Sequence, residues 1–294
     1  MTTSQSIVTL QAPAKVNLTL QILDKRADGY HELDSVMQKL DLCDTLHIQR
    51  EKKTGVSLSC PDSDLPEDES NLVFQAAESF LHDTGLAIKS GVSIVLEKRI
   101  PIAAGLGGGS SDAGTLLCGL DRMFATKLSE KRLLGLAKPL GADVPFFVLS
   151  GVAMHAQGIG ERLTEVSSLS DCSVLLVNPG FSVSTAWVYK NYSLTKTVKD
   201  SSLSDSRGND GKNEEGLVLY NDLESVTIAR YPEIETVKAS MLAGGASDTL
   251  MSGSGPTVFG IFPDSSVADV DKCADILRRK YGKGVFVTRP LLVD

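Results

Sequence analysis

A run of small residues, "PIAAGLGGGSSDAGTLL" at residues 101–117, constrains the fold more than any other stretch. Four glycines and two serines fill six of the seven positions from Gly105 to Ser111. The residues that follow place their apolar side chains on one face of a helix, at Ala113, Leu116, Leu117, Leu120 and Phe124. The run therefore predicts a tight loop that leads directly into the N-terminus of a helix.

Such a loop is suited to binding an anion. We expect Ser111 or Asp112 to be the N-cap, and the first backbone N–H groups of the helix to lack intrahelical acceptors. Glycines let these groups approach a phosphate closely, and Lys98 and Arg99 add positive charge just upstream. Close packing against a neighbouring strand, or a merely flexible loop, explains the glycines equally well at this point.

Two familiar phosphate-binding motifs are excluded by single positions. A Walker A motif needs lysine after its last glycine, but Ser110 follows Gly109. A dinucleotide-binding motif that starts at Gly105 needs glycine at position 110, which is again this serine. The loop therefore belongs to neither class.

Composition indicates a globular protein with reduced thiols. Of the 294 residues, 42% are hydrophobic and 22% charged, and the net charge of −8 argues against a general nucleic-acid-binding surface. The five cysteines show no C-x-x-C spacing, which is typical of a reducing compartment. The N-terminus has no signal-peptide pattern, and the apolar stretch at residues 144–154 is too short for a membrane span. We therefore expect a cytoplasmic protein.

Strand and helix patterns alternate too irregularly for a doubly wound sheet and favour an α+β fold. Period-two alternation predicts strands at 16–23, 44–50 and 91–99, and helical periodicity predicts helices at 71–85 and from Ser129. A polar stretch at 191–216 is expected to be a flexible surface loop, and a boundary between two domains is expected within 165–173.

Three stretches in order, at 12–20, 101–114 and 252–262, resemble the three motifs of the GHMP kinase superfamily, which phosphorylates small alcohols with ATP. The stretches at 27–44 and 140–147 most resemble a branch whose acceptor alcohol carries a cytidine diphosphate group. Two further stretches, at 178–190 and 221–224, resemble the same branch. The resemblance implies a two-domain α+β fold, with residues 1–167 like domain 2 of ribosomal protein S5 and residues 168–294 ferredoxin-like, and an active site in the cleft between them.

The resemblance also implies residue roles. Asp143 corresponds to the general base and Lys15 to the residue that keeps it ionised and offsets transition-state charge. Without the resemblance, a turn or cap aspartate and a structural ion pair would be the simpler interpretations. The implied acceptor is a tertiary hydroxyl of a methylerythritol, and the residues implied to bind this substrate are Asn17, Tyr30, His31, Asp143 and Tyr189.

Within this substrate set, Tyr30 is expected to stack on the cytosine and His31 to hydrogen-bond to it. Tyr189 is expected to form a second aromatic wall, although it could equally be a core aromatic on a helix. Asn17 is expected to contact the erythritol part of the substrate. For each of these residues, an ordinary turn, strand or core position remains the structural alternative.

ATP is the implied co-substrate, with Mg²⁺ arriving on its phosphates and no predicted protein metal site. The residues implied to bind it are Asn71, Lys98, Gly105, Leu106, Gly107, Gly108, Gly109, Ser110 and Ser111. Asn71 could instead be only the N-cap of its helix. Residues 253–255 are expected to support the loop architecturally.

Two other functions stay open on sequence alone. One is a different GHMP kinase, acting on homoserine, mevalonate or a sugar; a substrate without a nucleobase would leave Tyr30 without a stacking role. The other is a non-catalytic nucleotide- or RNA-binding module on an S5-like fold. We expect a small-molecule partner, no nucleic acid or membrane partner, and a monomer or weak homodimer.

Overall fold

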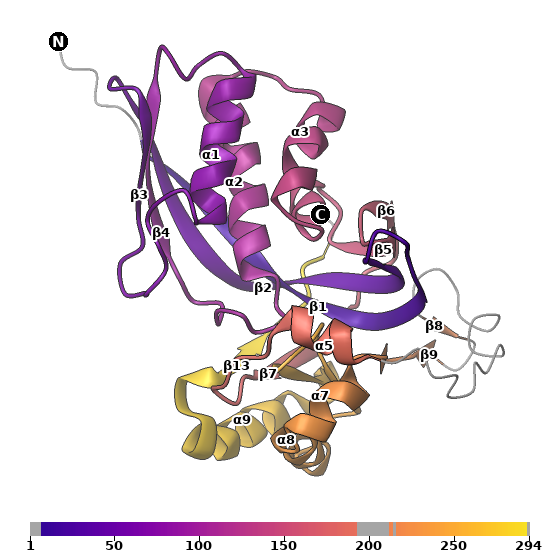
Figure 1. The fold of residues 1–294 in the computed structure, drawn as a ribbon. Helices are drawn as coiled ribbons and strands as arrows, with labels where there is room; N and C mark the ends of the chain where they lie inside the picture. Colours follow the sequence, from indigo (N-terminus) through magenta and orange to yellow (C-terminus); the bar gives the residue numbers. More distant parts are fainter. Residues whose placement is uncertain (1–6, 193–211, 214–215, 293–294) are drawn as a thin grey trace. The chain divides into compact units, whose positions relative to one another are not determined.

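Two long strands, β1 (Val8–Lys25) and β2 (His31–Glu51), dominate the N-terminal part of the chain (Figure 1). The computed structural model describes residues 7–192, 212–213 and 216–292. Both strands are longer than the sequence predicts, because the alternation of apolar and polar residues breaks where strand residues are buried on both faces. Residues 16–20 of β1 are all buried, including the polar Asn17 and Thr19.

The chain forms two compact units that interleave along the sequence. Unit 1 contains the described residues up to Ala14, together with Cys43–Ile100 and Gly107–Ser150. Unit 2 contains Lys15–Leu42, Pro101–Leu106 and the described residues from Gly151 onward. The expected boundary between the two family domains is a single one, at residues 167/168, and it stays a prediction.

Unit 1 packs helices against strands β2, β4 and β3. The second half of β2 pairs antiparallel with β4 in the register Leu46↔Leu96, and β3 pairs parallel with β4. The elements of this unit after β2 are β3 (Gly55–Ser59), α1 (Leu72–Asp83), β4 (Gly91–Glu97), α2 (Gly108–Phe124), α3 (Glu130–Ala137), a 3₁₀ turn (Lys138–Leu140) and α4 (Val144–Val148). Its core joins Leu46 and Ile94 of the strands to Phe80 of α1 and Leu116 of α2.

Unit 2 contains a four-stranded antiparallel sheet in the order β11-β12-β7-β13, and also pairs the first half of β2 with β5. Short β10 runs parallel to β1. The strands are β5 (Ala153–Gly158), β6 (Arg162–Glu165), β7 (Cys172–Val177), β8 (Lys212–Asn213), β9 (Gly216–Leu217), β10 (Tyr220–Asn221), β11 (Asp248–Met251), β12 (Val258–Pro263) and β13 (Val285–Thr288).

Helices α8 and α9 pack against this four-stranded sheet (Figure 1). The helices of unit 2 are α5 (Thr185–Asn191), α7 (Glu224–Arg230), α8 (Glu233–Ala243) and α9 (Val267–Tyr281), with 3₁₀ turns at Asp264–Ser266 and Gly282–Gly284. Two separate sheets with helices confirm the predicted α+β class. Most of the predicted loop at 191–216 lies outside the described residues. None of the helices that the structure describes is long and apolar enough to cross a lipid bilayer.

Candidate active site

The glycine run is half loop and half helix. Helix α2 begins at Gly108, and its N-cap is Gly107, whose φ of +70° is readily adopted by glycine. The N-cap predicted at Ser111 or Asp112 is therefore wrong: the Ser111 N–H already donates to the Gly107 carbonyl at 2.8 Å, within the first turn. As a result, the N–H groups that lack intrahelical acceptors belong to residues 108–110, in the middle of the run.

The third motif packs against the first residues of the loop within unit 2. A Cβ on Gly105 would collide with the Ser252 carbonyl, and φ at Gly105 is +78°, so glycine is required there. The Ser252 hydroxyl donates to the Gly105 carbonyl at 2.9 Å, and the Thr257 N–H donates to the Ala104 carbonyl at 3.3 Å. The Lys15 N–H also donates to the Leu106 carbonyl at 2.9 Å. These contacts fix the path of the loop.

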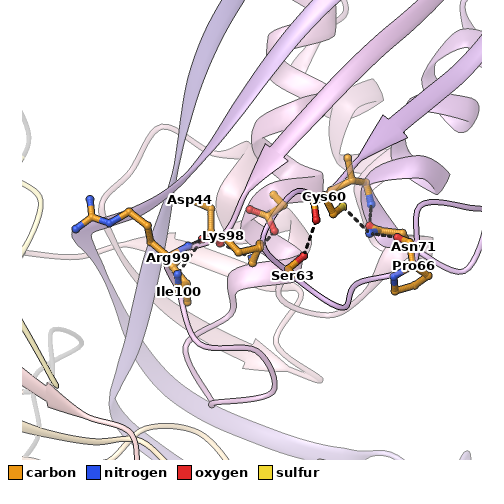
Figure 2. A network of polar contacts seen from close by, with 10 residues as sticks. Asp44, Cys60, Ser63, Pro66, Asn71, Lys98, Arg99 and Ile100 are labelled. Atoms are coloured by element: carbon orange, nitrogen blue, oxygen red, sulfur yellow. Dashed lines mark hydrogen bonds and ion pairs between the residues drawn. The ribbon is translucent and has the colours of Figure 1, made fainter. Parts of the chain in front are cut away.

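Lys98 lies in a buried polar network beside the loop in unit 1 (Figure 2). Its ammonium donates to Asp44 and, at 2.7 Å, to Asp112. The two carboxylates hold the pKa of Lys98 above its ordinary value despite the opposing effect of burial. A Cβ on Gly108 would lie 3.3 Å from the Lys98 ammonium, which places this charge at the first residue of α2.

Asn71 caps helix α1. Its side-chain oxygen accepts from the Val73 N–H at 2.9 Å, and its amide nitrogen donates to the Pro66 carbonyl at 2.8 Å (Figure 2). Of the two roles considered for Asn71, the structure displays the cap. A role in nucleotide binding stays a prediction.

Asp143 occupies the N-cap position of α4, a helix that packs closely on α2 within unit 1. Gly114 of α2 permits this approach, because a Cβ there would lie 2.8 Å from Phe147 Cβ and 3.0 Å from the Val144 carbonyl oxygen. A Cβ on Gly141 would lie 4.0 Å from the Ser110 hydroxyl. The segment that carries Asp143 therefore adjoins the first turn of α2.

Lys15 and Asn17 form a buried polar chain in unit 2. Lys15 is 4% exposed, and its ammonium donates to the Asn17 side-chain oxygen. The Asn17 side-chain nitrogen in turn donates to the Ser35 hydroxyl at 2.9 Å. The Ser35 hydroxyl donates to the Thr19 carbonyl at 2.6 Å. Burial of these polar groups is stabilised by the hydrogen bonds, which also fix the direction of the Lys15 side chain.

The structure brings together two of the three rings expected to bind a base. The His31 and Tyr189 ring centroids are 5.2 Å apart with an interplanar angle of 34°. Burial, together with the charge of Lys25, lowers the pKa of His31 and so favours its neutral form. Tyr30 lies on the adjacent turn with 60% of its surface exposed.

Helix α5, which carries Tyr189, is tied to the third motif. The Thr185 and Ser254 hydroxyls lie 2.8 Å apart, and the Ser184 hydroxyl caps the helix by accepting from the Trp187 N–H. The aromatic pair and the first residues of the glycine loop are therefore both connected to residues 252–254 of unit 2.

Two buried oxygens near the start of α2, Ser111 Oγ and Asp112 Oδ1, have no hydrogen-bond partner. Oxygens of this kind are the ligands that Mg²⁺ prefers, but two of them do not make a protein cage. Among the described residues, no group of three or more His, Cys, Asp or Glu side chains could hold a metal ion.

Sequence reasoning assigned no site role to Asp44, Ser35 or Ser252, and it considered Asp112 only as an N-cap. Asp44 offered a signal, because it is the one carboxylate in the stretch "LCDTLHI", residues 42–48, of a strand. A charge in such a position needs a partner. Its partners come from distant parts of the chain, so only the fold identifies them.

Comparison with known proteins agrees with these motifs. The family model described as "GHMP kinases N terminal domain" matches residues 71–151, and the model "GHMP kinases C terminal" matches residues 207–283. Among solved structures, a 4-(cytidine 5'-diphospho)-2C-methyl-D-erythritol kinase is 33% identical with a TM-score of 0.78, covering 96% of this chain and 99% of its own. A homoserine kinase from Cytophaga hutchinsonii, 18% identical with a TM-score of 0.76, shares the fold.

Curated relatives extend the similarity along the sequence. The 4-diphosphocytidyl-2-C-methyl-D-erythritol kinase of Desulfotalea psychrophila is 43% identical over 281 residues, which is 95% of this chain and 94% of the relative. The enzyme of the same name from Geobacter sulfurreducens is 44% identical over 273 residues, 93% of this chain and 95% of the relative. The chain therefore belongs to the 4-diphosphocytidyl-2-C-methyl-D-erythritol kinase family of the GHMP kinases.

Proposed function

We propose that this protein transfers the γ-phosphate of ATP to the tertiary 2-hydroxyl of 4-diphosphocytidyl-2-C-methyl-D-erythritol, a step of non-mevalonate isoprenoid precursor synthesis. The observation that carries the proposal is the 43–44% identity, over more than nine tenths of the chain, to relatives named for this substrate. Features within each of the two units support it.

The N-terminus of α2 is the proposed binding site for the ATP phosphates. Its first N–H groups lack intrahelical acceptors, and the helix dipole favours an anion there. Glycines at positions 107, 108 and 109 keep side chains away from these donors. The Ser110 and Ser111 hydroxyls would add donors, and Ser111 Oγ is without a partner in the structure.

Asp143 is the proposed general base for the acceptor hydroxyl. A positioned carboxylate contributes to phosphoryl transfer by orienting the nucleophile and accepting its proton. Its position at the start of α4, next to the first turn of α2, is compatible with a base close to the phosphates. Lys15, oriented by Asn17, would supply positive charge, and Asn17 would contact the erythritol part.

The cytosine of the substrate is proposed to bind at Tyr30, His31 and Tyr189. Neutral imidazole can donate and accept hydrogen bonds at once, which suits the edge of a base. Stacking on an aromatic ring stabilises a bound base by about 1–3 kcal/mol. A substrate without a base would make no use of this aromatic group.

Mg²⁺ is proposed to enter with ATP and to offset phosphate charge. A cytoplasmic location and a monomeric or weakly dimeric state, without a nucleic-acid partner, complete the proposal. The composition and the net charge of −8 support the absence of a nucleic-acid partner.

The test is ADP release from ATP with three acceptors in parallel: 4-diphosphocytidyl-2-C-methyl-D-erythritol, homoserine and mevalonate. We expect turnover with the first acceptor alone. Turnover with homoserine or mevalonate, and none with the cytidylyl substrate, would replace the proposal by another GHMP kinase activity.

A further inference from the structure

Three charged side chains meet away from water beside the first turn of α2. Lys98, which follows β4, donates to Asp44 of β2 and to Asp112 of α2 (Figure 2). Their side chains are 8%, 0% and 1% exposed, respectively. Two carboxylates share one ammonium, so the formal charge of the group is −1 when both are ionised. Burying such a group costs free energy unless its charges are paired and hydrogen-bonded.

Each carboxylate holds a different piece of unit 1. Asp44 Oδ1 accepts from the Arg99 N–H at 2.6 Å and the Ile100 N–H at 2.8 Å, which fixes the segment that follows β4. Asp112 Oδ2 accepts from Lys98 at 2.7 Å and so joins α2 to that segment. Lys98 is the bridge between the two carboxylates.

The start of α2 rests directly on this bridge. A Cβ on Gly108 would lie 3.1 Å from Ile100 Cγ2 and 3.3 Å from Lys98 Nζ. The position of the first helical turn therefore depends on where Lys98 and Ile100 are held. An ammonium has three N–H donors, and the two carboxylates take two of them, which leaves Lys98 at most one for a phosphate.

We propose that Asp112 and Asp44, acting through Lys98, are positioning residues that hold the first turn of α2 in the geometry that binds nucleotide phosphates. The inference rests on the proposed function, because it takes the α2 N-terminus as the phosphate site. In this proposal the main role of Lys98 is to bridge the two carboxylates. The proposal also gives a role to Asp44 and Asp112, whose negative charge would by itself repel a phosphate.

The test is calorimetric titration of the full chain with ATP in the presence of Mg²⁺. Asp112→Ala removes the contact with Lys98, and we expect ATP to bind about tenfold to a hundredfold more weakly, the range for a lost charge-assisted hydrogen bond. Asp112→Asn keeps an acceptor of the same shape for Lys98, so it restores most of the affinity.

Asp121→Ala is the matched control on the same helix. Asp121 accepts from the Thr126 hydroxyl at 2.6 Å and the Leu128 N–H at 2.8 Å, beyond the opposite end of α2. This variant should lose stability and keep its ATP affinity. Unchanged ATP affinity in Asp112→Ala, equal losses of ATP affinity in Asp112→Ala and Asp121→Ala, or an affinity of Asp112→Asn as low as that of Asp112→Ala would overturn the inference.

Measuring binding rather than turnover separates this inference from the proposed function. If ATP binding depends on Asp112 while the cytidylyl alcohol is not phosphorylated, the function fails and the positioning role stands. If the alcohol is phosphorylated and Asp112→Ala changes only its KM, leaving ATP affinity intact, the positioning role fails and the function stands.

Discussion

Replacing Gly114 of α2 by alanine should slow catalysis in a protein that still folds. Alanine is favoured over glycine inside a helix by about 1 kcal/mol. The added Cβ would lie 2.8 Å from Phe147 Cβ and 3.0 Å from the Val144 carbonyl oxygen, and overpacking of this kind costs about 1–3 kcal/mol. The free energy of unfolding should therefore fall by between about 0 and 2 kcal/mol.

The effect on kcat follows from where the clash lies. To reach an ordinary contact of 3.4 Å, Phe147 must move by about 0.6 Å and the Val144 carbonyl, at the start of α4, by about 0.4 Å relative to α2. Val144 is adjacent to Asp143, so the proposed base moves with it. A displacement of 1 Å at a reacting group can cost about a hundredfold, so we expect a shift of about half that size to lower kcat about tenfold.

Gly119→Ala is the matched control, because it makes the same change on the same helix. The Cβ at position 119 would meet the side-chain methyl groups of Leu10, which can rotate away, and its three nearest atoms all belong to Leu10 and none to α4. Steady-state ADP release gives kcat, and urea denaturation gives stability. An unchanged kcat in Gly114→Ala, or an equal loss of kcat in Gly119→Ala, would refute the reasoning.

Three further predictions concern the proposed base, the proposed cytosine-binding ring of Tyr189 and the pair Asp34–His155. Asp143→Asn should retain ATP binding in calorimetric titration and lose at least about a hundredfold in kcat, the usual effect of a lost general base; near-normal turnover would exclude this role. Tyr189→Ala should raise the KM for the cytidylyl substrate about fivefold or more, because a stacking surface is lost, and leave the KM for ATP unchanged; equal effects on both would contradict base stacking. The hydrogen bond that His155 Nε2 donates to the Asp34 carboxylate, at 2.9 Å, raises the pKa of His155 above its ordinary 6.5. This pair therefore stabilises the fold fully below pH 6.5 and loses its contribution as pH rises through the raised folded value, by less than about 1 kcal/mol. Urea titrations at pH 6 and pH 8.5 should show this decrease in wild type and not in Asp34→Asn, and an identical decrease in both would contradict it.

Local patterns in the sequence predicted several elements well. Asn71 before an apolar periodic segment predicted the cap of α1, and the structure shows that hydrogen bond. The start of α2 was predicted four or five residues too late, because serine and aspartate are usual N-caps. Here Gly107 takes that place through its left-handed backbone. Local propensity therefore identified the helix but not the conformation that begins it.

The candidate site could be predicted only where a single stretch carries it. The glycine run and the resemblance of five short motifs indicated the phosphate loop and its companions. The bridge from Asp44 through Lys98 to Asp112 joins three segments, and each carboxylate alone looks like a turn or cap residue. The approach of His31 to Tyr189 likewise joins residues more than 150 positions apart. Such contacts depend on how distant segments pack within one unit rather than on any local pattern.

The most direct test of the account is the phosphorus NMR spectrum of the product formed from ATP and 4-diphosphocytidyl-2-C-methyl-D-erythritol. The account predicts one new phosphomonoester, attached to the tertiary carbon of the methylerythritol, with an intact cytidine diphosphate. A phosphate on a primary or secondary hydroxyl, or no new phosphomonoester although the protein is folded and binds ATP, would contradict it.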